Sequence, residues 1–201
     1  DGFQAVAPWQ RGLIARPLEL DFSGADLRFV WKPTEQLTIE PSFSFYDERR
    51  SQGTPATGNT TEAFDASLRI SSEDGPLSWQ ALGYYQRRRF ASVFSSVDPT
   101  RSSESVALNQ FDVPGEGIGG AFTLRREIDE TLHVSIGTDL RLLEGETNED
   151  AGTFRRRRAG GAQSFAGIFA TSDWQALPDM RVDASVRLDY WELRDGKRIE
   201  R

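Results

Sequence analysis

Two runs of arginine are the residues in this chain whose type and spacing best suit chemistry with a ligand. A guanidinium group matches the planar geometry of phosphate and carboxylate groups, so a run of arginines predicts contact with anions. We therefore expect each run to contact the phosphates of anionic lipids or an anionic substrate. The residues concerned are Arg87, Arg88, Arg89, Arg155, Arg156, Arg157 and Arg158.

Each run also has a simpler interpretation, which we favour. Arg87–Arg89 can be the solvated end of a strand. Arg155–Arg158 can belong to a solvated loop with internal charge balance, because acidic residues precede it in the sequence. These acids could pair with the arginines or bind calcium weakly; they are Glu144, Glu146, Glu149 and Asp150.

The remaining composition argues against catalysis. The chain has no cysteine, which excludes disulfides, thiolate metal sites and cysteine nucleophiles. Its single histidine, His133, leaves little material for a zinc site or a histidine-based triad, and Asp183 and Asp189 have no partner nucleophile or base. A net charge of −7 argues against nucleic-acid binding, which needs a basic surface. We predict that the chain is not an enzyme and binds no cofactor, metal or nucleic acid.

These side chains must be positioned by β-strands, because apolar and polar residues alternate over long stretches. The clearest unit is residues 25–46, where two alternating strands flank a polar turn at 33–36. Three similar units follow, with short turns near residues 75, 129 and 177. Long polar loops are predicted between the units, over about residues 47–61, 90–115 and 143–161. The later strands are predicted at 62–72, 77–86, 117–126, 132–142, 163–172 and 181–191.

The alternation gives each strand one apolar and one polar face. We expect one surface of the sheet to carry Leu37, Ile39, Phe43, Val134, Ile136, Leu140, Val186 and Leu188. The opposite surface should carry Glu40, Ser135, Asp139, Asp183 and Arg187.

The strand pattern predicts an all-β, antiparallel, up-and-down transmembrane β-barrel. With 37% hydrophobic residues and a mean hydropathy of −0.53, no transmembrane helix is predicted. Strands of about 10 residues, with aromatic residues near both ends, are typical of a barrel in the bacterial outer membrane. Trp31, Trp79 and Trp174 lie near the short turns, and Tyr46, Tyr85 and Tyr190 lie toward the other end. Arg87–Arg89 then lies near the outer edge of the hydrocarbon band, within reach of lipopolysaccharide phosphates.

Three segments resemble the barrel of TonB-dependent outer-membrane receptors. They are LRFVWKPTEQLTIEPSFSFY, LNQFDVPGEGIGG and SFAGIFATSDWQALPDMRVDASVRLDYW. The resemblance covers about residues 25–195. It consists of the pattern of turns and of apolar and polar strand faces, rather than of fixed catalytic residues. It implies a 22-stranded barrel with an N-terminal plug domain, which imports iron-siderophores, cobalamin or carbohydrates with energy from TonB. The implied partners are outer-membrane lipid and lipopolysaccharide, a small-molecule nutrient, and the TonB complex through the plug.

The sequence departs from this family in having about eight strands, no recognisable plug and no TonB-contacting segment. We therefore expect an internal part of a larger barrel, with 1–24 as an irregular lead-in, 25–195 as the barrel segment and 196–201 as a charged tail. No binding residue of the family can be carried over. Two alternatives stay open: a small complete outer-membrane barrel with a structural or adhesion role, and a soluble β-barrel or sandwich that binds a hydrophobic ligand.

Overall fold

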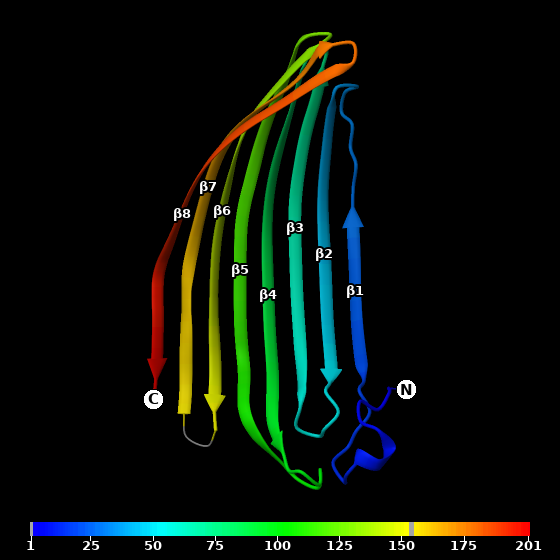
Figure 1. Cartoon of the computed structure of the whole chain (residues 1–201), viewed down its shortest axis with the longest axis vertical. Helices are drawn as coiled ribbons and strands as arrows, with labels where there is room; N and C mark the ends of the chain where they lie inside the picture. Colours follow the sequence, from blue (N-terminus) through cyan, green and yellow to red (C-terminus); the bar gives the residue numbers. More distant parts are fainter. Residues whose placement is uncertain (1, 153–154) are drawn as a thin grey trace.

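The computed structural model describes residues 2–152 and 155–201 and shows one antiparallel sheet (Figure 1). Each strand pairs with its neighbours in the chain, which gives the order β1 to β8. A 3-10 turn, η1 (Pro8–Gln10), precedes strands β1 (Leu20–Arg28), β2 (Leu37–Ser51), β3 (Gly58–Asp74), β4 (Leu77–Val97), β5 (Glu104–Asp129), β6 (Leu132–Ala151), β7 (Arg155–Leu177) and β8 (Met180–Glu200). The predicted all-β, up-and-down, antiparallel arrangement of eight strands is confirmed. In the part of the chain described, β1 and β8 are the edges of an open sheet.

The connections alternate between two ends of the sheet, as predicted. At one end, called the turn end, strands are joined through residues 29–36, 75–76, 130–131 and 178–179. At the other, called the loop end, β2 joins β3 through 52–57 and β4 joins β5 through 98–103. Figure 1 shows the turn end at the top and both chain termini at the bottom. No helix in the described ranges has the length and hydropathy needed to cross a membrane.

The predicted long loops are wrong, because most of their residues continue the strands. β2 extends to Ser51, β4 to Val97 and β6 to Ala151, so Arg87–Arg89 lies inside β4 and Arg155–Arg158 begins β7. Backbone pairing continues through these extensions, while polar side chains occupy both faces. The alternation of apolar and polar residues therefore disappears from the sequence although the strands persist.

The predicted ends of the barrel segment also need correction. β1 begins at Leu20, inside the expected lead-in, and β8 runs to Glu200, through most of the expected tail. The alternation does not reveal the start of β1, because its apolar residues change faces within the strand. Phe22 shares a face with Gly24, whereas Leu27 lies on the opposite face. β1 ends at Arg28, and Trp31 is held next to Ile39 only by an isolated bridge.

The strand register confirms the predicted facing. Directly opposite residues share a face in paired strands, so one row can be followed across the sheet. One such row is Leu37, Ser72, Trp79, Leu124, Ile136, Ala170 and Val186. The parallel row through Glu40 lies on the other surface, as do Asp139, Asp183 and Arg187. We call these surfaces the apolar face and the polar face.

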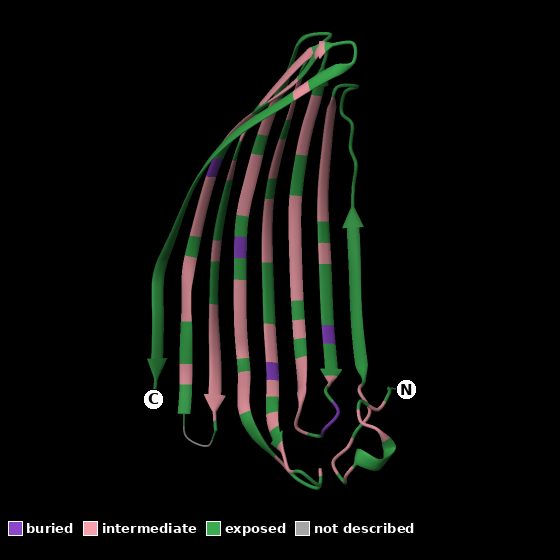
Figure 2. Cartoon of the chain, in the orientation of Figure 1, coloured by how far each residue is buried: buried purple, intermediate pink, exposed green. Residues whose placement is uncertain are grey.

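The apolar face carries a continuous belt of exposed apolar side chains over β2–β8. None of the described apolar residues is buried, and Leu140 and Leu188 are 60% and 66% exposed. Figure 2 shows intermediate and exposed residues along nearly the whole length of every strand. The sheet formed by residues 2–152 and 155–201 therefore has no internal apolar core, and its stability in water would lack the usual contribution of apolar burial.

The belt has the height and slope expected of tilted strands in a bilayer. On β2 it runs from Leu37 to Phe45, about 27 Å at 3.4 Å per residue. On β8 it runs from Val182 to Tyr190. Relative to its position on β2, it is displaced toward the turn end by two rows, where successive rows on one face are two residues apart along a strand. A tilt of 35–45° reduces 27 Å to about 20 Å along the barrel axis, close to the apolar band of about 25 Å seen in membrane barrels.

Aromatic side chains border the belt at both ends. Toward the loop end, the ring of Phe64 lies between those of Phe45 and Tyr85, with centroids 5.0 and 6.3 Å away. Toward the turn end, Trp79 stacks on Phe122 at 6.2 Å, and Trp31 and Trp174 occupy the same face. Rings with apolar bodies and polar edges favour such positions at a membrane interface.

Candidate functional site

The polar face of β4–β8 gathers the side chains best suited to hold a ligand. One row across these strands consists of Tyr84, Gly119, Arg141, Phe165 and Trp191. The guanidinium of Arg141 lies over the Phe165 ring at 4.5 Å from its centroid, a cation–π contact. Trp191 stands beside them and is 62% exposed. The row therefore brings three aromatic side chains and a guanidinium group together on the polar face.

The adjoining rows add a charge-balanced group. Asp139 and Asp189 lie on either side of Gly167, and Arg187 from the next row reaches both. Its guanidinium lies 2.8 Å from Asp139 Oδ2 and 2.6 Å from Asp189 Oδ1. Hydrogen bonds between ions are stronger and more directional than neutral ones, so Arg187 fixes the positions of both carboxylates.

Glycines on the polar face allow these side chains to lie flat on the sheet. A methyl group at Gly119 would overlap the Tyr84 hydroxyl, and one at Gly167 would overlap the Arg187 guanidinium. At Gly137 it would overlap the Phe169 ring. Next to these glycines lies a shallow cavity of about 380 Å³, called the central hollow, which is lined by Gly120, Ala121 and Leu140 and by the side chains of Tyr84, Asp139, Arg141, Phe165, Arg187, Asp189 and Trp191.

The chemistry that this arrangement offers is binding. Its carboxylates accept hydrogen bonds, its guanidinium groups donate them, and Trp191 offers a stacking surface. His133 lies away from the hollow, near the turn end, 4.0 Å from Glu127. Among the described residues, no group of three or more histidine, cysteine, aspartate or glutamate side chains is placed to share a metal ion.

The predicted arginines of β4 divide between the two faces. Arg87 and Arg89 lie on the apolar face, in register with Phe64 and Glu62 at the loop-end border of the belt, whereas Arg88 lies on the polar face. Arg87 Nε is 3.6 Å from Glu116 Oε1, and Arg89 Nε donates to Asp112 Oδ1 at 2.8 Å. With Glu62 and Phe64 they line a hollow of about 260 Å³. They thus lie at the predicted border, although inside a strand rather than at its end.

The predicted arginines of β7 are paired with carboxylates of β6 and β8. Arg156 and Arg158 contact Asp150 and Glu146 at 2.8 and 2.6 Å. Arg157 Nε lies 2.8 Å from Glu149 Oε1, outside hydrogen-bond geometry, and Arg155 lies 3.5 Å from Glu200. Pairing with the preceding acids was expected and is confirmed for Glu146, Glu149 and Asp150. Arg158, then Asn148 and Lys197, hydrogen-bond to Glu146 and lower the pKa of its carboxyl to about 2.

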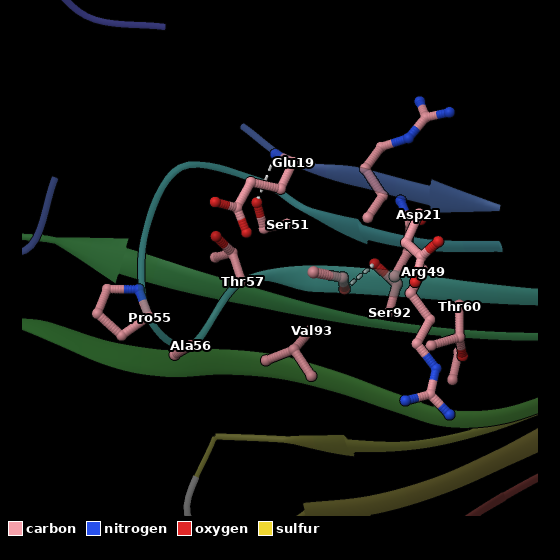
Figure 3. Close-up of a pocket in the computed structure, with 14 residues that line it drawn as sticks. Glu19, Asp21, Arg49, Ser51, Pro55, Ala56, Thr57, Thr60, Ser92 and Val93 are labelled. Carbon is pink, nitrogen blue, oxygen red and sulfur yellow. Dashed lines mark hydrogen bonds between the residues drawn. The ribbon is translucent and has the colours of Figure 1, made fainter. Parts of the chain in front are cut away.

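A second cavity lies on the apolar side of the loop end, outside the belt. It measures about 490 Å³ and is lined by parts of β1–β4 and the β2–β3 loop (Figure 3). Figure 3 shows Arg49 directed along the wall near Thr60, and the Ser51 hydroxyl accepting a hydrogen bond from the backbone of Glu19. The sequence offered no signal for this cavity, because the residues that form it were interpreted as loop.

One carboxylate fastens the loop next to this cavity. Glu104 of β5 accepts hydrogen bonds from the hydroxyls of Thr54 and Ser95, both at 2.6 Å, and from the Ala56 amide at 2.8 Å. Burial raises the pKa of the Glu104 carboxyl, but the hydrogen bonds from Ser95, Thr54 and Ala56 outweigh it and leave the pKa lowered. The ionised carboxylate therefore holds the β2–β3 loop against the β4–β5 hairpin.

The central hollow was missed at the sequence level because it depends on register. Alternation alone placed Asp139 and Arg187 on one face, but it could not show that they meet. The glycines at 119, 137 and 167 are the signal that could have found it, since glycine inside a strand often marks close approach by a neighbour.

Comparisons with known proteins find little. No protein-family model matches the chain, and no curated protein matches it significantly. Among solved structures, the chain is similar to the beta domain of the Bordetella autotransporter Brka, with 13% sequence identity and a TM-score of 0.42. The match covers 91% of this chain and 76% of that one. A similarity of this degree identifies neither a family nor a function.

Proposed function

We propose that this chain forms the wall of a β-barrel in the bacterial outer membrane, with the apolar belt against lipid and the polar face toward the lumen. The exposed belt is the observation that carries the proposal. Seven strands are separated by six spacings of about 4.8 Å, and a length of about 27 Å along each strand gives the belt an area of roughly 800 Å². The largest apolar patch on a soluble monomer is usually about 300–600 Å². Contact with lipid removes the free-energy cost of exposing this apolar area to water.

Two further features support the same orientation. The aromatic borders stand where the two interfaces of a bilayer would lie, and strands β4–β7 continue past the belt at the loop end only. Membrane barrels have short periplasmic turns and longer extracellular segments, so we propose that the loop end faces the outside of the cell. Arg87 and Arg89 then lie at the outer interface, where lipopolysaccharide phosphates are their proposed contacts.

Within this class, we propose a TonB-dependent receptor barrel that takes up a scarce nutrient such as an iron-siderophore, cobalamin or a carbohydrate. The resemblance of residues 27–46, 108–120 and 164–191 to such receptors supports it. The proposed partners are outer-membrane lipid, the nutrient, and the TonB complex through a plug domain. Uptake by cells producing the full receptor should stop in a strain that lacks TonB. Uptake that continues there would contradict the receptor assignment and leave the barrel proposal standing.

Flotation with lipid vesicles tests the membrane proposal. The chain is refolded in micelles of a non-ionic detergent, transferred to phospholipid vesicles and centrifuged through a density gradient. It should float with the vesicles, resist extraction at pH 11, and expose Trp31, Trp79 and Trp174 to a lipid-soluble fluorescence quencher, since these lie on the apolar face.

The matched control is Trp191, which lies on the polar face and should escape that quencher. A chain that remains monomeric in plain buffer and stays at the bottom of the gradient would contradict the membrane proposal. It would then favour the soluble barrel, in which the apolar face turns inward.

A further inference from the structure

The central hollow has the composition of a site for a polyhydroxylated ligand. Trp191 supplies a large apolar surface with a polar N–H, and it is 62% exposed on the edge strand β8. Phe165 stands directly opposite on β7, with its ring covered by the Arg141 guanidinium. Stacking against a ring that carries both C–H faces and hydroxyls is suited to this combination of aromatic surface and hydrogen-bonding groups.

The charge of the hollow favours a neutral ligand. It contains two carboxylates, Asp139 and Asp189, and two guanidinium groups, Arg141 and Arg187. These charges cancel, and Arg187 is already held by both carboxylates. An anionic ligand would have to compete with those ion pairs, whereas hydroxyl groups can donate to the remaining carboxylate lone pairs and accept from free guanidinium N–H groups.

The shape of the hollow is also suitable. Its volume of about 380 Å³ lies within the range of about 300–1,000 Å³ typical of small-ligand sites. Gly119 and Gly167 allow Tyr84 and Arg187 to fold down onto the sheet beside the hollow, because a side chain at either glycine would overlap them. Tyr84 and Trp191 lie on the outermost of the strands that line the hollow, four strand spacings or about 19 Å apart.

We propose that the central hollow binds a neutral saccharide, with a sugar ring stacked on Trp191 and its hydroxyls bonded to Asp139, Asp189 and Arg141. The inference rests on the proposed function, because the hollow faces the lumen only if the belt faces lipid. Of the nutrients named in the proposed function, it selects the carbohydrate. The side chains act by binding and positioning, and no bond of the ligand is made or broken.

Calorimetric titration of the full chain in a detergent without a sugar headgroup tests this assignment. The probes are maltotriose, cellotriose and xylotriose as neutral saccharides, and ferric citrate as an anionic ligand. At least one trisaccharide should bind and ferric citrate should not. Trp191→Leu should weaken the binding about tenfold, because it removes the aromatic surface on which the sugar ring is stacked.

Trp79→Leu is the matched control, because Trp79 lies on the apolar face and its replacement keeps an apolar residue in the belt. It should leave the binding unchanged, and Arg187→Gln should weaken it by releasing Asp139 and Asp189. Circular dichroism confirms that each variant retains its strands. Equal binding by Trp191→Leu and wild type, or preferential binding of ferric citrate, would overturn the inference.

Flotation of the same preparation separates this inference from the proposed function. A chain that inserts into vesicles yet binds none of the trisaccharides overturns the saccharide site and leaves the membrane barrel intact. A chain that binds a trisaccharide through Trp191 but does not insert overturns the membrane proposal and retains the saccharide site.

Discussion

Replacing Ile136 by arginine should destabilise the chain far more than the same replacement at Leu142. Both residues lie on the apolar face of β6, and they are similarly exposed, at 52% and 50%. They differ in depth, since Ile136 lies near the middle of the belt and Leu142 precedes the charged Glu144. Six residues separate them by about 20 Å along the strand.

The expected magnitudes follow from that depth. An arginine on the lipid face of a membrane barrel costs about 2–4 kcal/mol at the midplane and about 0–1 kcal/mol near the interface. We therefore expect Ile136→Arg to cost about 2–4 kcal/mol and Leu142→Arg about 0–1 kcal/mol. Ser135→Arg is the control for the polar face, where an arginine stays hydrated and should cost little.

Urea unfolding in phospholipid vesicles, followed by tryptophan fluorescence, measures these differences. Equal costs at Ile136 and Leu142 would refute the lipid-facing belt, because a bilayer imposes a dependence on depth. A large cost at Ser135 together with a small one at Ile136 would reverse the assignment of the two faces.

Three further predictions concern the loop end. Arg87→Gln/Arg89→Gln should weaken adsorption to lipopolysaccharide, and more so at low salt, because exposed charges are screened over about 8–10 Å at physiological salt. The unfolding free energy should change little, since surface ion pairs contribute little to stability. Equal adsorption by the variant and the wild type would exclude contact between these arginines and lipopolysaccharide. Glu104→Ala should expose the β2–β3 loop to limited proteolysis, whereas Glu104→Gln keeps part of the hydrogen bonding and should be cut more slowly. Because the pKa of Glu146 is lowered from 4.5 to about 2, its ionised form stabilises the fold above pH 4.5, and this contribution is lost as the pH falls toward 2. The difference in unfolding free energy between wild type and Glu146→Gln should shrink over that interval, and a difference independent of pH would contradict the pairing with Arg158.

The parts of the fold that the sequence predicts are those governed by a single local rule. Alternation over 37–46 and 132–142 correctly separated Ile39 from Glu40 and Leu140 from Asp139, because a side chain in a strand has only two faces to choose from. Turn chemistry located the hairpin at Gly75, whose φ of 55° lies in the left-handed region that glycine tolerates.

The alternation rule fails where both faces of a strand carry polar side chains. Arg155–Arg158 and their β6 partners are polar on both faces, so neither period nor hydropathy distinguishes this paired strand from a loop. Backbone hydrogen bonds and ion pairs with Glu146, Glu149 and Asp150 keep the ladder extended there. The sequence predicts this pairing only as charge balance within a loop, because nothing local to either segment shows that the pairs join two strands.

The central hollow depends on register, which a bulge of one residue determines. The β7–β8 hairpin begins with Leu177 opposite Met180, and continued without irregularity it would place Phe165 opposite Glu192. A register shift between Gln175 and Leu177 moves the pairing by one residue, so that Phe165 faces Trp191. A shift of one residue exchanges the faces of a strand. Without it, Trp191 would share a face with Ile168 rather than with Phe165, and Val186 and Leu188 would leave the belt. The bulge therefore places β8 correctly on both surfaces at once, with its apolar residues in the belt and Trp191 in the hollow.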